Sequence, residues 1–211
     1  MTAAAETPRK QTHGGSIVAM PSQSRIGWAQ AALLFAVCGI ASSQMTYLDN
    51  WGDYLLPVPF GILAAWLCVG RAVSGFCLVI LDAAVWRLAL RVAVELGAEG
   101  PTGRKLFAMC LAGLIGGLGV TVSTALAKWQ RPTVSSLAAG AAIGAICGLP
   151  FAWWLVAGNQ APLPEWAMLL VSFAIWQGAV GLNLWWNFGL GKRPFDPSGR
   201  PFPGAETAAR Q

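Results

Sequence analysis

Long apolar segments without charge are the feature that most limits what this chain can fold into. Residues 28–45, 106–127, 133–157 and 166–190 each form such a segment of at least 18 residues. A helix of about 20 apolar residues spans the roughly 30 Å hydrocarbon core of a bilayer. Only 11% of all residues are charged, against about 25% in an average soluble domain. The sequence therefore predicts an all-α integral membrane protein.

The two ends of the chain differ in composition from its centre. Residues 1–25 are polar and show no apolar periodicity, so a disordered leader is expected there. Residues 26–190 hold the apolar segments and should form a polytopic helical membrane domain. Residues 191–211 are rich in proline and basic residues, which predicts a second disordered tail.

The number of spans depends on how residues 55–96 are divided. They could form two short spans with Arg71 at the turn, or one long tilted helix with Arg71 inside it. Six spans with both termini in the cytoplasm place 10 of the 14 Lys and Arg residues on the cytoplasmic side. Because cationic loops are retained on that side, this count favours six spans over five. We expect the six spans at residues 26–45, 55–70, 72–96, 106–127, 133–157 and 165–190.

Small residues recur every four positions in the fourth and fifth expected spans. Because this spacing places them above one another on one helix face, it lets another backbone approach closely, as in a glycine zipper. An antiparallel hairpin centred between residues 130 and 131 would bring the two rows into register, which predicts that the two helices pack through them. Oligomerisation or the lining of a pore is the alternative. The rows consist of Gly113, Gly117 and Thr121 in one span and Gly140, Gly144 and Gly148 in the other.

Asp82 is the one acidic residue deep inside an apolar segment. A charge at the centre of a membrane helix costs at least about 2.5–3.5 kcal/mol, so it should be neutral, paired or hydrated. Its expected partners are Arg71, Gln44, Gln177 and Asn183. Asp82 is then either a polar tie that fixes helix packing or a carboxylate that binds a proton or ligand, and the sequence favours neither interpretation.

The chemistry of the remaining residues argues against an enzyme. The only histidine, His13, lies in the leader, and no nucleotide-binding or hydrolase motif is present. We therefore expect no catalytic residue, no metal site and no cofactor.

Two functions agree best with this composition, and a lipid-modifying enzyme ranks third because no base or nucleophile is evident. The first is a non-catalytic accessory or assembly component of a membrane complex, and the alternative is a small transporter or channel with a polar site around Asp82. The expected partners are the lipid bilayer and either a membrane protein or further copies of the chain. No basic cluster is long enough to suggest nucleic-acid binding. Composition favours the bacterial inner (plasma) membrane as the location.

Overall fold

The computed structural model describes residues 26–48, 52–97, 99–158 and 162–189, and these ranges contain helices but no strand. Five helical segments are long and apolar enough to cross a membrane. The chain is therefore a multi-pass helical membrane protein. The expectations for residues 1–25 and 191–211 lie outside the described ranges. The five segments are α1 (Trp28–Met45), α4 (Ala72–Gly97), α5 (Thr102–Ala127), α6 (Val134–Cys147) continued by α7 (Leu149–Ala157), and α8 (Glu165–Phe188).

The segment between α1 and α4, whose number of spans the sequence left open, contains a short helix, and the chain turns back after it. A single turn, α2 (Gly52–Leu55), precedes α3 (Val58–Ala64), which continues into a π-helical turn, η2 (Ala65–Val69). Gly70 then takes a left-handed conformation (φ 68°) and reverses the chain. Because Gly has no Cβ, it adopts this conformation without steric cost. The alternative of one long tilted helix is therefore wrong, and Arg71 lies exposed at the turn.

The expected span at residues 55–70 is shorter than the other five. The apolar helix from Val58 to Val69 has 12 residues, which corresponds to about 18 Å at 1.5 Å per residue. This is less than the roughly 30 Å of a bilayer core. By length alone, the described chain has five membrane-spanning helices and this shorter one.

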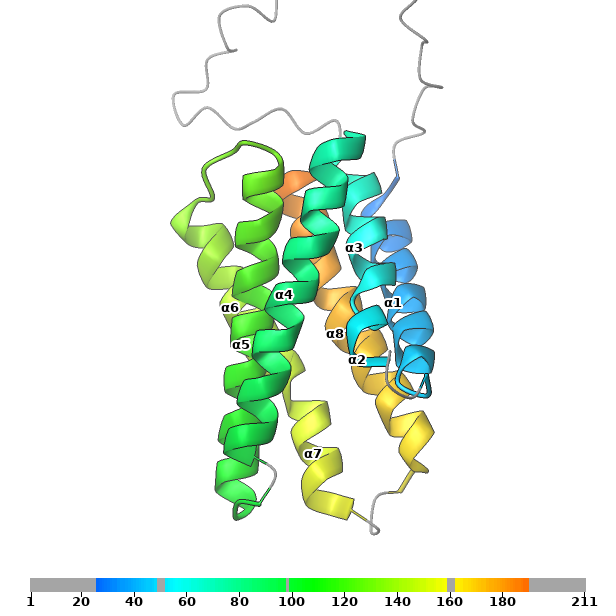
Figure 1. The fold of residues 1–211 in the computed structure, drawn as a ribbon, viewed down its shortest axis with the longest axis vertical. Helices are drawn as coiled ribbons and strands as arrows, with labels where there is room; N and C mark the ends of the chain where they lie inside the picture. Colours follow the sequence, from blue (N-terminus) through cyan, green and yellow to red (C-terminus); the bar gives the residue numbers. More distant parts are fainter. Residues whose placement is uncertain (1–25, 49–51, 98, 159–161, 190–211) are drawn as a thin grey trace, which may run out of the picture.

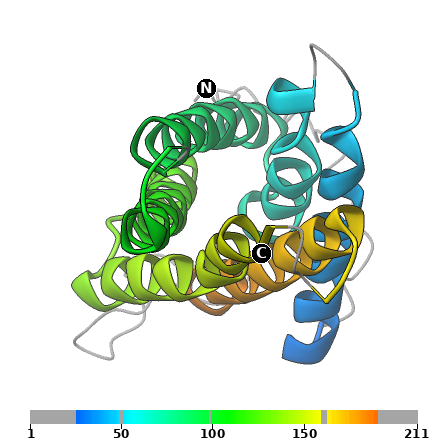
Figure 2. The same cartoon turned by 90° about the horizontal axis from the view of Figure 1, so that it is seen from below.

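The helices form a closed ring (Figure 2). Going around it, α1 packs on α8, α8 on α6, α6 on α5, α5 on α4, α4 on α3, and α3 returns to α1. The first turn of α1 and the last turn of α8 lie at the same end of the ring (Figure 1). At this end the Lys128 ammonium, just beyond α5, donates a hydrogen bond to the Phe188 carbonyl oxygen of α8.

The backbones of α5 and α6 come close together at the small residues of both helices. A Cβ added to Gly113 would collide with the Gly144 carbonyl oxygen and would lie 3.3 Å from Gly148 Cα. A Cβ on Gly117 would collide with the Gly140 carbonyl oxygen and would lie 3.0 Å from Gly144 Cα.

The close contact between α5 and α6 continues at both ends of the two rows of small residues. A Cβ on Gly140 would collide with the Thr121 hydroxyl, which itself donates to the Gly117 carbonyl oxygen (2.7 Å). A Cβ on Gly148 would collide with the Met109 carbonyl oxygen. A larger residue at these glycines therefore requires the two backbones to move apart.

Candidate functional site

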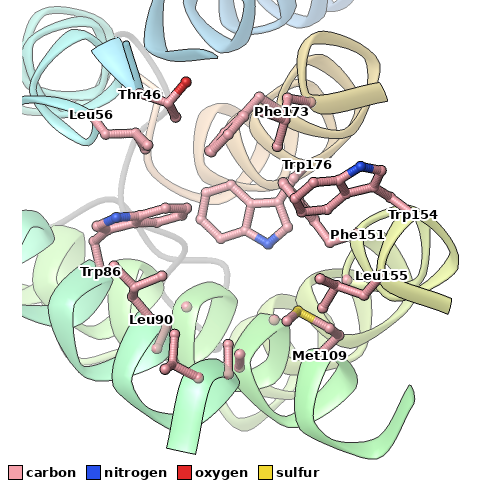
Figure 3. A pocket seen from close by; sticks show the side chains of 18 residues that line it. Thr46, Leu56, Trp86, Leu90, Met109, Phe151, Trp154, Leu155, Phe173 and Trp176 are labelled. Carbon is pink, nitrogen blue, oxygen red and sulfur yellow. The ribbon is translucent and has the colours of Figure 1, made fainter. Parts of the chain in front are cut away.

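An apolar pocket occupies the interior of the ring, in the half that lies away from Lys128 and Phe188. Its volume is about 300 Å³. It is lined by the second half of α4, the first halves of α5 and α8, and the inner face of α7. Its aromatic lining residues are Trp86, Phe151, Trp154, Phe173 and Trp176 (Figure 3). No charged side chain is among the described residues that line it.

One end of the pocket is bounded by aromatic side chains that contact one another across the ring. Trp86 of α4 packs edge-on against Trp176 of α8, with 6.1 Å between ring centroids, and lies 5.5 Å from Phe173 (Figure 3). Trp176 in turn contacts Phe60 of α3 (5.9 Å), and Phe60 contacts Phe35 of α1 (5.3 Å). We call these five residues the aromatic layer. Rings at such distances stabilise one another beyond the area that they bury.

Two backbone features make room for the pocket and the aromatic layer. Gly116 of α5 lies against the Trp176 indole, because a Cβ there would be 2.8 Å from Trp176 Cζ2. Pro150 at the start of α7 has no N–H to donate to the preceding turn, so the helix is interrupted between α6 and α7. The expected span at 133–157 remains one segment of 24 residues, interrupted only at Gly148, and Phe151 and Trp154 of α7 line the pocket.

Asp82 lies one helical turn beyond the aromatic layer, on the side away from the pocket. On α4, Trp86 and the other pocket residues all follow Asp82 in the chain. A spacing of four residues places Asp82 on the same face as Trp86, about 6 Å along the helix axis. Its side chain is 2% exposed, and neither carboxylate oxygen has a hydrogen-bond partner among the residues that the structure describes. A buried carboxylate in this state must take up a proton or receive a cationic or hydrogen-bonding partner.

None of the partners expected for Asp82, Gln44 included, forms a hydrogen bond with it among the described residues. Arg71 is exposed at the turn before α4. The Gln177 amide donates to the Ser42 hydroxyl (2.8 Å), and Asn183 accepts a hydrogen bond from Asn187 (3.0 Å). The structure thus does not bring Arg71, Gln177 or Asn183 into hydrogen bonds with Asp82.

Other polar groups in the interior also have no hydrogen-bond partner within the described chain. These groups include the Trp86 indole N–H, the Gln177 amide oxygen and the Asn183 amide nitrogen. The first of these belongs to the residue that separates Asp82 from the pocket. A ligand or water molecule could satisfy such groups, because buried polar atoms are rarely left unpaired.

One further titratable group, the Cys68 thiol, lies near Asp82, and Lys128 lies near that thiol. Cys68 of η2 is close enough to both Asp82 and Lys128 for their charges to act on its thiol. Lys128 is half-buried at the end of the ring, and this burial lowers the pKa of its ammonium. Within the part of the chain that the structure describes, no three or more His, Cys, Asp or Glu residues gather as metal ligands would.

Sequence reasoning identified Asp82 but missed the pocket, the aromatic layer and Trp86. The available signal was the spacing of four residues between Asp82 and Trp86, which places an aromatic ring next to the carboxylate on one helix face. The pocket itself is built from segments far apart in the sequence, so no local pattern predicts it.

The fold and this interior define the chain as a multi-pass helical membrane protein with an apolar pocket inside its helix ring. Comparison with known protein families, with curated proteins and with solved structures finds no match.

Proposed function

We propose that the chain is a small membrane transporter whose apolar pocket admits a ligand toward the site at Asp82. The observation that carries this proposal is the combination of a 300 Å³ interior pocket with a buried, unpaired carboxylate one helical turn beyond it. Pockets of this size and apolar character are typical of small-molecule sites. Ionisable groups inside a membrane domain are costly and are usually associated with transport or proton transfer. A purely structural subunit needs neither feature.

We further propose that α3 and η2 count as a sixth crossing and that both termini face the cytoplasm of a bacterial inner membrane. Arg71, Lys128 and Arg131 belong to the two turns at the end of the ring where α1 begins and α8 ends. Cationic turns are retained on the cytoplasmic side, which supports this orientation. Non-helical backbone at membrane depth is tolerated where it is buried in protein, and Leu56 after α2 is buried and lines the pocket. In this orientation the pocket lies toward the opposite membrane face.

The small residues of α5 and α6 have a supporting role in this proposal. Close backbone contact through glycine stripes stabilises helix pairs in lipid, where water exclusion between apolar surfaces gives no driving force. The α5–α6 pair would then form a rigid wall of the ring, against which the movable side chains of α4 and α8 rearrange.

Access of water to the pocket is the test of this proposal. Ala89 lines the pocket and is 6% exposed, whereas its neighbour Leu88 lies on the outer surface of α4 and is 55% exposed. The two positions have nearly the same depth in the membrane. Single Ala89→Cys and Leu88→Cys variants would be made in a chain whose five native cysteines are replaced by alanine. Each would be treated with a charged, membrane-impermeant methanethiosulfonate.

A thiol reacts as its thiolate, which needs a polar or hydrated environment. We expect the thiol at position 89 to react at least about tenfold faster than the thiol at position 88, and from the membrane face opposite the termini. Equal, slow reaction at both positions would contradict a transporter. It would favour the accessory or assembly component instead, which should then co-purify with a stoichiometric membrane-protein partner.

A further inference from the structure

We propose that the ligand is a small organic cation with an aromatic or branched apolar body, whose charge is matched by Asp82. This inference rests on the proposed function, because it assigns a ligand class to the same pocket. The pocket supplies the apolar surroundings, the aromatic layer supplies ring faces, and Asp82 supplies the counter-charge. Each of these contributions has its own observation.

The lining of the pocket suits a positively charged ligand more than an anionic one. Trp86, Trp154 and Trp176 bring three indoles to the pocket wall (Figure 3). The face of an aromatic ring attracts cations, and Trp does so most strongly. Because no Lys, Arg or His is among the described lining residues, nothing in the wall repels a cation or pairs with an anion.

The basic side chains nearest to Asp82 along the chain and at the same end of the ring do not neutralise it. Arg87 lies over the Tyr54 ring, with 4.4 Å from its guanidinium carbon to the ring centroid. Arg71 is exposed, and the Lys128 ammonium is bonded to the end of α8. Among the described residues, the Asp82 carboxylate is therefore left without a partner. In the low dielectric of this interior, its charge favours any cation that reaches the aromatic layer.

The size of the pocket limits the ligand further. A volume of about 300 Å³ lies at the lower end of the range for small-molecule sites. It suits a single aromatic ring with a quaternary or protonated amine, and it excludes a whole phospholipid or a peptide. The ammonium group would lie at the aromatic layer, and the apolar body would fill the rest of the pocket.

A matched pair of probes tests the charge directly. Benzyltrimethylammonium and neopentylbenzene have the same shape, because a carbon atom replaces the charged nitrogen in the second compound. Binding of both would be measured by equilibrium dialysis against the full-length protein in lipid nanodiscs, with protein-free nanodiscs subtracted. We expect the protein to bind the cation at least about tenfold more tightly than its uncharged isostere.

Two variants of α4 then locate the origin of this preference. Asp82→Asn keeps the side-chain shape and removes the charge, so we expect it to abolish the preference for the cation. Glu95→Gln removes an exposed carboxylate from the same helix and should leave the preference unchanged. The comparison of the two probes on the unmodified protein needs no variant, so it stands even if Asp82→Asn fails to fold.

The possible outcomes separate this inference from the proposed function. Equal binding of both probes, or a preference that survives Asp82→Asn, overturns the cation inference and leaves the pocket as a binding site for neutral molecules. If neither probe binds and the thiol at position 89 is also unreactive, the proposed function is overturned as well.

Discussion

Single residues determine where backbones and charges meet in this protein. Asp82 was recognisable from the sequence because an acidic residue inside an apolar helix is rare and conspicuous. The residues around Asp82 could not be recognised in this way, because several amide and arginine side chains of the sequence could pair with it. Gln177 instead reaches Ser42 on α1, a contact between residues 135 positions apart that no local pattern specifies.

A substitution at Gly117 tests the close contact between the backbones of α5 and α6. A Cβ added there would collide with the α6 backbone, so Gly117→Ala forces α5 and α6 apart. We expect a loss of about 1–3 kcal/mol in the free energy of unfolding, as is typical of overpacking. The measurement is reversible unfolding in mixed detergent micelles.

Gly103→Ala is the matched control on the same helix. A Cβ at Gly103 would meet nothing within 4 Å, so this change should be neutral or stabilise the helix by up to about 1 kcal/mol. Equal effects of the two alanines would show that close backbone contact between α5 and α6 does not hold the hairpin together.

The sequence predicted the helices and turns more completely than it predicted which side chains contact one another between helices. The long apolar segments correspond to α1, α4, α5, α6 with α7, and α8, because length and hydropathy are local properties. The reversal at Gly70 follows from a glycine beside a charged residue, and charge counting favoured a turn there. The break at Gly148, two residues before Pro150, was not expected, because a proline within a membrane span can also be accommodated without dividing the helix.

Pro150→Ala tests how the break positions the pocket wall. Restoring the N–H should straighten α6 and α7 into one helix and carry Phe151 and Trp154 away from the pocket. We expect the affinity for benzyltrimethylammonium and neopentylbenzene to fall alike by about tenfold, or about 1.4 kcal/mol. Dialysis measures this loss, and it should occur without loss of unfolding stability.

Pro101→Ala is the control, since Pro101 precedes α5 and does not line the pocket. If Pro150→Ala binds both probes as tightly as the unmodified chain does, the break in the helix does not shape the site.

The whole molecule is a ring of helices that is closed by the short helix α3 between α1 and α4. Sequence reasoning could weigh six spans against five only by counting charges, because a 12-residue apolar helix is ambiguous on its own. The pocket depends on the ring more than on any one helix, since its lining comes from α4, α5, α7 and α8 together. If α3 did not return along α4, Phe60 would not contact Trp176 and Phe35, and the ring would be open between α1 and α4.

Disulfide cross-linking between α3 and α4 tests this closure most directly. A Cβ added to Gly61 would lie 3.5 Å from Val79 Cβ, within the 3.5–4.5 Å that a disulfide requires. In a chain without its native cysteines, we expect Gly61→Cys with Val79→Cys to cross-link rapidly on mild oxidation. Gly61→Cys with Ile80→Cys should not, because Ile80 faces outward. One continuous helix would separate positions 61 and 79 by about 27 Å, so failure of the first pair to cross-link would contradict the closed ring.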